Sequence, residues 1–249
     1  LRSSAASDVY KRQVQGRAGA KLIGEMLGKK RVVMVTLNND FGKSLAAGFK
    51  EQASNFGVDV IAEYDYSIKD REFGPIISKI KADNPDAIYA SGYFFTAGPM
   101  VSQIRAAGLK QPIVGQEGYD SQKFIEIAGA ASEGVMITTS LDRDSSAPET
   151  QAFISGFSEK AGYPADMVAA SGHTALLVVA DALKRAGSGD ASALRDAISK
   201  TNLSASTGKI SFNTLGEVQK DVQVQVVKNG NWHHHSVISD SVLLAPPSK

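Results

Sequence analysis

The sequence predicts an α/β fold in which helices cover both faces of a mostly parallel sheet, a doubly wound arrangement. Between residues 14 and 140, short β-branched segments alternate with segments whose apolar residues recur at helical spacing, which is the pattern of successive β-α-β units. The first β-branched segment, residues 31–37 (RVVMVTL), is apolar almost throughout, as expected of a strand buried on both faces. The chain has 249 residues, 43% of them apolar, which is enough for one large core or two smaller ones.

The first elements establish the pattern that the next ones repeat. Residues 15–27 carry apolar side chains on one helical face, and Gly28 follows where a helix can end. After the strand at residues 31–37, polar residues lead into an amphipathic helix at residues 41–56, which Gly57 closes. The same alternation predicts strands at residues 58–64, 86–91, 111–115 and 133–140, and helices at residues 71–82, 97–107 and 121–127.

The pattern changes after Ser140. Residues 141–149 (LDRDSSAPE) are polar and contain a proline, as in a hinge or a domain boundary. Helices are then predicted at residues 148–161, 165–186 and 191–201 with no strand between them, and the remaining strand candidates are residues 209–212, 221–227 and 232–238, the last two joined by a hairpin-like turn. These helices have too little sheet to cover, so we expect the parallel strands of this second region to lie upstream of Val14.

Composition excludes several kinds of site and partner. The chain contains no cysteine, which excludes disulfides, a thiolate nucleophile and cysteine-ligated metals. It has 27 basic and 26 acidic residues, so bulk electrostatic binding to nucleic acid is not expected. The most apolar stretch, residues 175–183, contains Asp181 and is shorter than a membrane-spanning helix. Residues 1–13 lack the apolar run of a signal peptide, and we interpret them as a non-native tail, with a native polar arm as the alternative.

Ligand-binding residues are expected where the parallel strands end, because ligands of open parallel sheets bind beyond the carboxyl ends of the strands. The predicted strand ends present aromatic and acidic side chains. These residues are Asn38, Asp40, Phe41, Tyr66, Ser67, Tyr93, Phe94, Glu117, Tyr119 and Asp120. A carboxylate pairs with an ammonium group, while aromatic rings offer apolar walls or cation-π contacts. The set suits a small ligand with an apolar body and a cationic group.

Each of these residues also has a purely structural interpretation. Asp40 is well placed to be the N-cap of the helix that follows it, and Phe41 could act as a hydrophobic staple. Tyr93 could cover the sheet with its hydroxyl in water, and Glu117 could be a solvated loop carboxylate. Residue type and position leave both interpretations open.

An ordered series of segments resembles a known family. The segments are QGRAGAKLI, VVMVTLNNDFGKSLAAGFKE, DAIYASGYFFTAGPMVSQIRAAGLKQPIVGQEGYD and ASEGVMITTS. In this order they resemble the periplasmic branched-chain amino-acid binding proteins, which are type I substrate-binding proteins of ABC transporters. The resemblance extends from Val14 to about Gly230. It implies the type I periplasmic-binding-protein fold, in which two α/β lobes joined by three crossings close on an amino acid.

The resemblance also implies roles for individual residues. Phe41, the aromatic residue before the glycine of NNDFG, would line the ligand, and Tyr93 of SGYFF would contact it. Glu117 of GQEGYD would hold the ligand's α-ammonium group, with Tyr119 and Asp120 as further candidates. Several relatives have tyrosine at the position of Phe41, so a hydrogen bond from that hydroxyl is absent here. No catalytic residue, metal ligand or cofactor is implied.

The same resemblance divides the chain into parts. Residues 14–140 would be the C-terminal lobe, one complete doubly wound parallel-sheet lobe that forms a wall of the site. Residues 141–218 would be the helical remainder of an incomplete N-terminal lobe, and residues 219–249 the final crossing strands and a tail. In the family, the N-terminal units that hold the ligand carboxylate come first, so we expect an N-terminally truncated chain, whose single wall binds amino acids poorly or not at all.

Other motifs predict no chemistry. In WHHH, residues 232–235, neighbouring side chains of a strand alternate between its faces, so only His233 and His235 would share one, and no acidic partner is close in sequence. We therefore expect no metal site there. His173 lies in an apolar helix without a nucleophile elbow or partner acid, and we interpret it as a packing residue. No phosphate-binding or calcium-binding loop pattern occurs.

Taken with the resemblance, the sequence predicts a non-catalytic substrate-binding component of an ABC transporter. It would capture a branched-chain amino acid such as leucine, another hydrophobic amino acid or a related small amide, and deliver it to a membrane permease. Its location would be the periplasm, or the cell surface as a lipoprotein. The alternative is a ligand-sensing domain of a regulator or receptor on the same fold. A third possibility is an enzyme with Glu117 or Asp120 as general base, which no nucleophile or cofactor motif supports.

Overall fold

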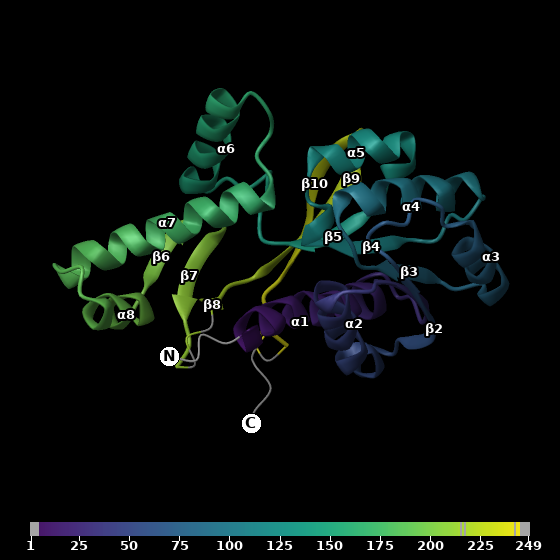
Figure 1. Ribbon diagram of the computed structural model, residues 1–249, viewed down its shortest axis with the longest axis horizontal. Helices are drawn as coiled ribbons and strands as arrows, with labels where there is room; N and C mark the ends of the chain where they lie inside the picture. Colours follow the sequence, from purple (N-terminus) through teal and green to yellow (C-terminus); the bar gives the residue numbers. More distant parts are fainter. Residues whose placement is uncertain (1–4, 215, 217, 242, 245–249) are drawn as a thin grey trace.

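The chain folds into a large α/β region and a smaller, mostly helical region beside it (Figure 1). The computed structural model describes residues 5–214, 216, 218–241 and 243–244, with side chains from Gln13 onward. The outermost parts of the two tails expected from the sequence, residues 1–4 and 245–249, lie outside the described residues.

A seven-stranded sheet forms the centre of the larger region, in the order β10-β9-β5-β4-β3-β1-β2. Its five parallel strands, confirming the predicted sheet, are β1 (Arg31–Leu37), β2 (Asp59–Tyr66), β3 (Ala87–Ala90), β4 (Ile113–Gln116) and β5 (Met136–Thr139). β9 (Val222–Lys228) pairs antiparallel with β5, and β10 (Asn231–Ile238) pairs antiparallel with β9. The predicted C-terminal hairpin therefore extends the main sheet at its β5 edge.

Helices cover both faces of this sheet because successive side chains of a strand point to opposite faces. Val33, Val35 and Leu37 of β1 pack with α3, α4 and α5, whereas Val32 and Met34 pack with α1 and α2 on the other face. The helices are α1 (Ala5–Lys21), α2 (Asp40–Ala53), α3 (Gly74–Asp83), α4 (Phe94–Ala106) and α5 (Gln122–Ala128). This is the predicted doubly wound arrangement.

α1 differs from the helix predicted at residues 15–27. It begins at Ala5, and its continuation, η1 (Leu22–Met26), is a π-helical turn. The boundary expected at residue 13 therefore lies inside a helix. Two glycines let α1 approach its neighbours closely: a Cβ on Gly16 would lie 2.2 Å from the carbonyl oxygen of Leu45 in α2, and one on Gly19 would lie 2.7 Å from the ring of Tyr89.

Replacing Gly16 with alanine is expected to lower the free energy of unfolding by about 1–3 kcal/mol, because the added methyl meets backbone atoms that move only with the whole of α2. Gly156→Ala in the helix α6 (Pro148–Ala161) is the matched control, since its Cβ would meet no described atom within 4 Å. That change should raise stability by about 0.5–1 kcal/mol. Urea unfolding measures both, and equal midpoints for Gly16→Ala and the wild type would contradict the close packing of α1 on α2.

The second region consists of three helices and a small antiparallel sheet in the order β6-β7-β8. Its elements are α6 (Pro148–Ala161), α7 (Met167–Ala186), α8 (Ala191–Ser199), β6 (Asn202–Ala205), β7 (Gly208–Phe212) and β8 (Val218–Gln219). Of these elements, β6 and β8 were not predicted from the sequence. His173 of α7 stacks on Phe153 at 4.8 Å between ring centroids, and its Nδ1 lies 3.1 Å from the hydroxyl of Ser206, so it packs between α6 and the small sheet.

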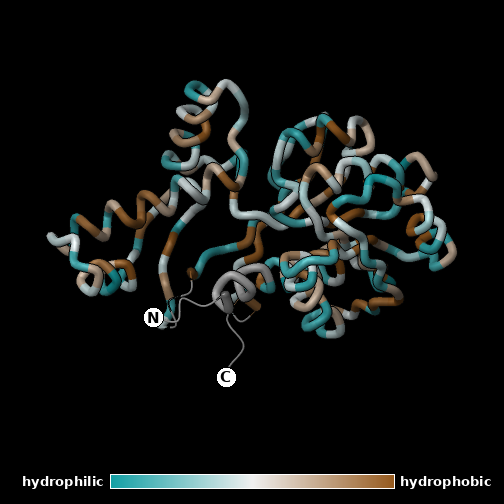
Figure 2. The backbone as a smooth tube through the Cα atoms, in the orientation of Figure 1, coloured by the Kyte–Doolittle hydropathy of each residue, from teal (hydrophilic) through white to brown (hydrophobic). Residues whose placement is uncertain are grey.

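α7 is longer than the apolar stretch that the sequence analysis judged too short to span a bilayer. This 20-residue helix is long and apolar enough, by length and composition, to cross a membrane, and 28% of its 18-residue apolar window is buried. Its polar contacts are those of a helix packed on protein, since Thr174 lies 3.0 Å from the Ser206 hydroxyl. Figure 2 shows that hydrophobic residues recur along α7. Leu176, which is 72% exposed, lies on the exposed side of the helix together with Val179 and Leu183.

Candidate functional site

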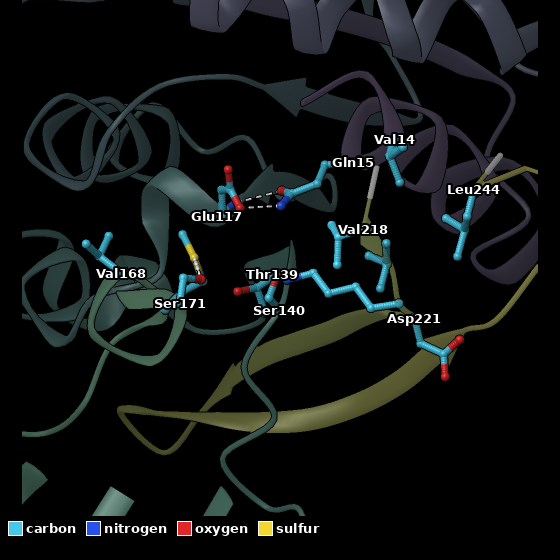
Figure 3. A pocket seen from close by; sticks show the side chains of 13 residues that line it. Val14, Gln15, Glu117, Thr139, Ser140, Val168, Ser171, Val218, Asp221 and Leu244 are labelled. Atoms are coloured by element: carbon cyan, nitrogen blue, oxygen red, sulfur yellow. Dashed lines mark hydrogen bonds between the residues drawn. The ribbon is translucent and has the colours of Figure 1, made fainter. Parts of the chain in front are cut away.

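A cavity of about 400 Å³ lies between the carboxyl edge of the main sheet and the second region (Figure 3). This volume is in the range of small-ligand pockets. The lining comes from α1, the ends of β4 and β5, the start of α7, the segment that leads into β9 and the segment after β10. The residues are Val14, Gln15, Glu117, Thr139, Ser140, Met167, Val168, Ser171, Val218, Lys220, Asp221, Val222 and Leu244.

Glu117 lines the cavity. It directly follows β4 and is the first residue of a 3-10 turn, η3 (Glu117–Tyr119). The turn is held by the fully buried amide of Gln116, which accepts from the N–H of Gly118 at 2.6 Å and donates to the carbonyl of Gly92 at 2.8 Å. The loop after β4 is thereby tied to the loop after β3. The predicted ammonium-binding carboxylate therefore sits on a well-supported strand end.

Gln15 of α1 contacts Glu117 twice (Figure 3). Its side-chain Nε2 donates to the Glu117 carboxylate, and its Oε1 accepts from the Glu117 backbone N–H at 3.2 Å. The two residues are 102 positions apart in the chain. The sequence analysis did not single out Gln15, because a glutamine in a helix carries no signal of what it faces.

Phe41 and Tyr93 lie together at the neighbouring strand ends. Their rings stack with centroids 4.9 Å apart and planes 11° apart, because Phe41 lies in the first turn of α2 after β1 and Tyr93 is the N-cap residue of α4 after β3. Phe41 is 8% exposed and Tyr93 is half-buried. Neither is among the residues that line the cavity. The structure thus brings the two aromatic residues into contact with each other and places only Glu117 of this trio in the cavity wall.

The helix cap after β1 differs from the prediction. Asn39, not Asp40, is the N-cap of α2, and its Oδ1 accepts from the N–H of Gly42 at 2.8 Å. Asn39 has the extended backbone that a capping residue requires, whereas Asp40 already lies in the first turn. An acidic side chain there is favourable because the helix dipole is positive at this end.

Tyr119 and Asp120 point into the protein instead of the cavity. Tyr119 is fully buried and stacks on Phe124 at 5.2 Å, and burial raises the pKa of its hydroxyl well above the usual value. Asp120, 3% exposed, accepts a hydrogen bond from Thr139 Oγ1 at 2.5 Å and forms an ion pair with Arg143. Because the η3 turn directs both side chains beneath the strand ends, Tyr119 packs in the core and Asp120 contacts the segment that follows β5.

Charges of both signs line the cavity. The cavity is lined by the acidic Glu117 and the half-buried Lys220, together with apolar side chains from α7 and β8. Asp221 is exposed, and Figure 3 shows its carboxylate directed away from Glu117. The cavity therefore combines an anion, a cation and an apolar surface, which is the set that a hydrophobic zwitterion requires.

The histidines of β10 have acidic partners that the sequence analysis did not foresee. His233 Nδ1 lies 3.2 Å from Asp144, and His234 Nδ1 lies 3.1 Å from Asp142, both in the segment that follows β5. A register shift near His234 interrupts the simple alternation of the strand. Within the part of the chain that the structure describes, no three His, Asp or Glu side chains form a group that could hold a metal ion.

Known proteins with sequences similar to that of this chain are solute-binding proteins. A family model described as periplasmic binding protein matches residues 7–231. The leucine-, isoleucine-, valine-, threonine- and alanine-binding protein of Pseudomonas aeruginosa is 26% identical over 208 residues, which cover 83% of this chain and 55% of that protein. The Leu/Ile/Val-binding protein of Citrobacter freundii is 24% identical over 227 residues, covering 91% of this chain and 60% of that protein.

Solved structures show the same likeness. A leucine binding protein of Thermotoga maritima superposes with a TM-score of 0.85 and 32% identity, covering 92% of this chain and 66% of that one. A solute-binding protein of R. palustris in complex with benzoate shares the fold, with a TM-score of 0.82 and 23% identity. The match covers 91% of this chain and 63% of that one. The chain thus spans between about half and two thirds of the length of the relatives it matches.

Proposed function

Because this chain belongs to the periplasmic binding protein family, we propose that it is the substrate-binding component of an ABC transporter and that it binds a branched-chain or other hydrophobic amino acid. It performs no chemistry on that ligand. Its partner is a membrane permease, and it works in the periplasm or at the cell surface. The names of its relatives, which bind leucine, isoleucine and valine, support this ligand class.

One observation carries the proposal: the Glu117 carboxylate, fixed by Gln15 at a strand end, lines a cavity with apolar walls. An α-ammonium group that pairs with this carboxylate would contribute about 1.5–3 kcal/mol. Met167, Val168 and Val222 offer apolar contacts to a side chain. A benzoate-like ligand has no ammonium group to pair with Glu117, and its carboxylate adds a second negative charge to the cavity, which disfavours it.

The test is a titration of ¹⁵N-labelled protein with leucine, valine, phenylalanine and benzoate, followed by NMR so that weak binding is measurable. We expect saturable shifts around Glu117 with leucine at a Kd of about 1 mM, which corresponds to about −4 kcal/mol. Benzoate should bind more weakly than leucine. Failure of all three amino acids to bind, or tighter binding of benzoate, would contradict the proposed ligand class.

Lys220→Met is expected to weaken leucine binding by about tenfold, because Lys220 lines the cavity and its ammonium group can pair with the ligand carboxylate. Leucinamide, which lacks that carboxylate, should bind the variant and the wild type alike. The exposed Lys209 of β7 supplies a matched control, Lys209→Met, for the loss of one positive charge. An equal loss for leucine and leucinamide would show that Lys220 does not recognise the carboxylate.

A further inference from the structure

We propose that Gln15 is the positioning residue for ammonium recognition: it acts on the ligand through Glu117. This inference rests on the proposed function. The sequence and the family resemblance pointed only to residues at strand ends, whereas Gln15 comes from a helix on one face of the sheet and reaches the same carboxylate. Its importance follows from the geometry of the pair.

The orientation of the Gln15 amide is determined by its partners. The Glu117 backbone N–H can only donate, so the group 3.2 Å from it must be the amide oxygen of Gln15. The NH₂ end then faces the Glu117 carboxylate, which can only accept when ionised. One side chain thus holds both the main chain and the carboxylate of Glu117, and this two-point contact sets the direction of the carboxylate.

Gln15 itself is rigidly held. It is 7% exposed, and its neighbours in α1 lock the helix onto α2. Gly16 packs against the backbone of α2, and the fully buried Arg17 pairs with Glu51 of α2 at 2.9 Å. A shift of the backbone at Gln15 would require α1 to move on α2, so the amide reaches Glu117 from a fixed helix.

A neutral amide is well suited to orient the Glu117 carboxylate. A carboxylate offers about four acceptor sites, so one bond from Gln15 can fix its direction without occupying all of them. The amide is neutral, so it does not change the net charge of the Glu117 carboxylate. A lysine at position 15 would neutralise that charge, and a glutamate would repel it.

Gln15→Met keeps the length of the side chain and removes both hydrogen bonds. We expect its Kd for leucine to rise about tenfold, because Glu117 must then be ordered at the moment of binding. Binding of 4-methylpentanoate, the same molecule without the ammonium group, should change less than about twofold. Gln13→Met is the matched control: it lies on the same helix, about 200° away, and should alter neither value.

A double-mutant cycle separates positioning from a general structural role. In the Glu117→Gln background, Gln15→Met should have no further effect on leucine binding, since its target is already lost. Gln15→Glu is a second variant that keeps the acceptor for the Glu117 N–H and replaces the donor with a like charge, and it too should lose the preference for leucine over 4-methylpentanoate.

The outcomes distinguish the two proposals. If the wild type prefers leucine and Gln15→Met keeps that preference, or if the losses add in the double mutant, the role of Gln15 is overturned and the proposed function stands. If the wild type binds no amino acid, the proposed function and the inference that rests on it both fail. Urea unfolding of each variant confirms that folded protein was compared.

Discussion

Replacing Asp120 with alanine is expected to lower the free energy of unfolding by about 3–5 kcal/mol, because it leaves the largely buried guanidinium of Arg143 without its carboxylate. Arg143 also donates to the carbonyl of Ala165 at 3.2 Å, so it joins the end of the main sheet to the second region. Asp120→Asn keeps an acceptor for Thr139 and should cost about half as much. Urea unfolding with a common m value measures both variants.

An exposed ion pair supplies the control for Asp120. Asp196 lies 3.1 Å from Arg195, with both side chains more than 60% exposed. Asp196→Ala should change stability by less than about 1 kcal/mol, because surface pairs are screened by solvent. Similar losses for Asp120→Ala and Asp196→Ala would mean that the pair with Arg143 does not stabilise the junction of the two regions.

Glu117→Gln is expected to reverse the ligand preference of the cavity. Without the negative charge, leucine should bind at least tenfold more weakly, since a charge-assisted bond of about 1.5–3 kcal/mol is lost. 4-Methylpentanoate should bind more tightly than it does to the wild type, because the repulsion between two carboxylates is gone. Both affinities come from the same NMR titration.

Glu126→Gln on α5 is the matched control for this charge change, since Glu126 is an exposed partner of Lys123. It should leave both affinities within about twofold of the wild type. If Glu117→Gln retains the wild-type affinity for leucine, Glu117 is not the ammonium partner, and the ligand would have to be held by other residues of the cavity.

Local sequence patterns predicted most of the elements, because burial on one face leaves a period in the sequence. α6 matches its predicted range, with Pro148 in its first turn and Gly162 in the left-handed conformation at its end. β6 and β8 were missed because they have only four and two residues, too few for an alternating pattern to stand out. The choice between Asn39 and Asp40 as the cap was equally hidden, since both are good capping residues and only the backbone decides.

The sequence by itself determined the doubly wound sheet of the larger region and, through the family resemblance, pointed to Glu117 as the ammonium-binding carboxylate. Only the tertiary structure decided which strand-end residues face the cavity. It buried Tyr119, paired Asp120 with Arg143, stacked Phe41 on Tyr93, and brought Gln15 to Glu117 across 102 residues. The physical reason is that periodicity records which face of an element is buried, whereas contacts between distant elements depend on strand order, register and the direction of each turn.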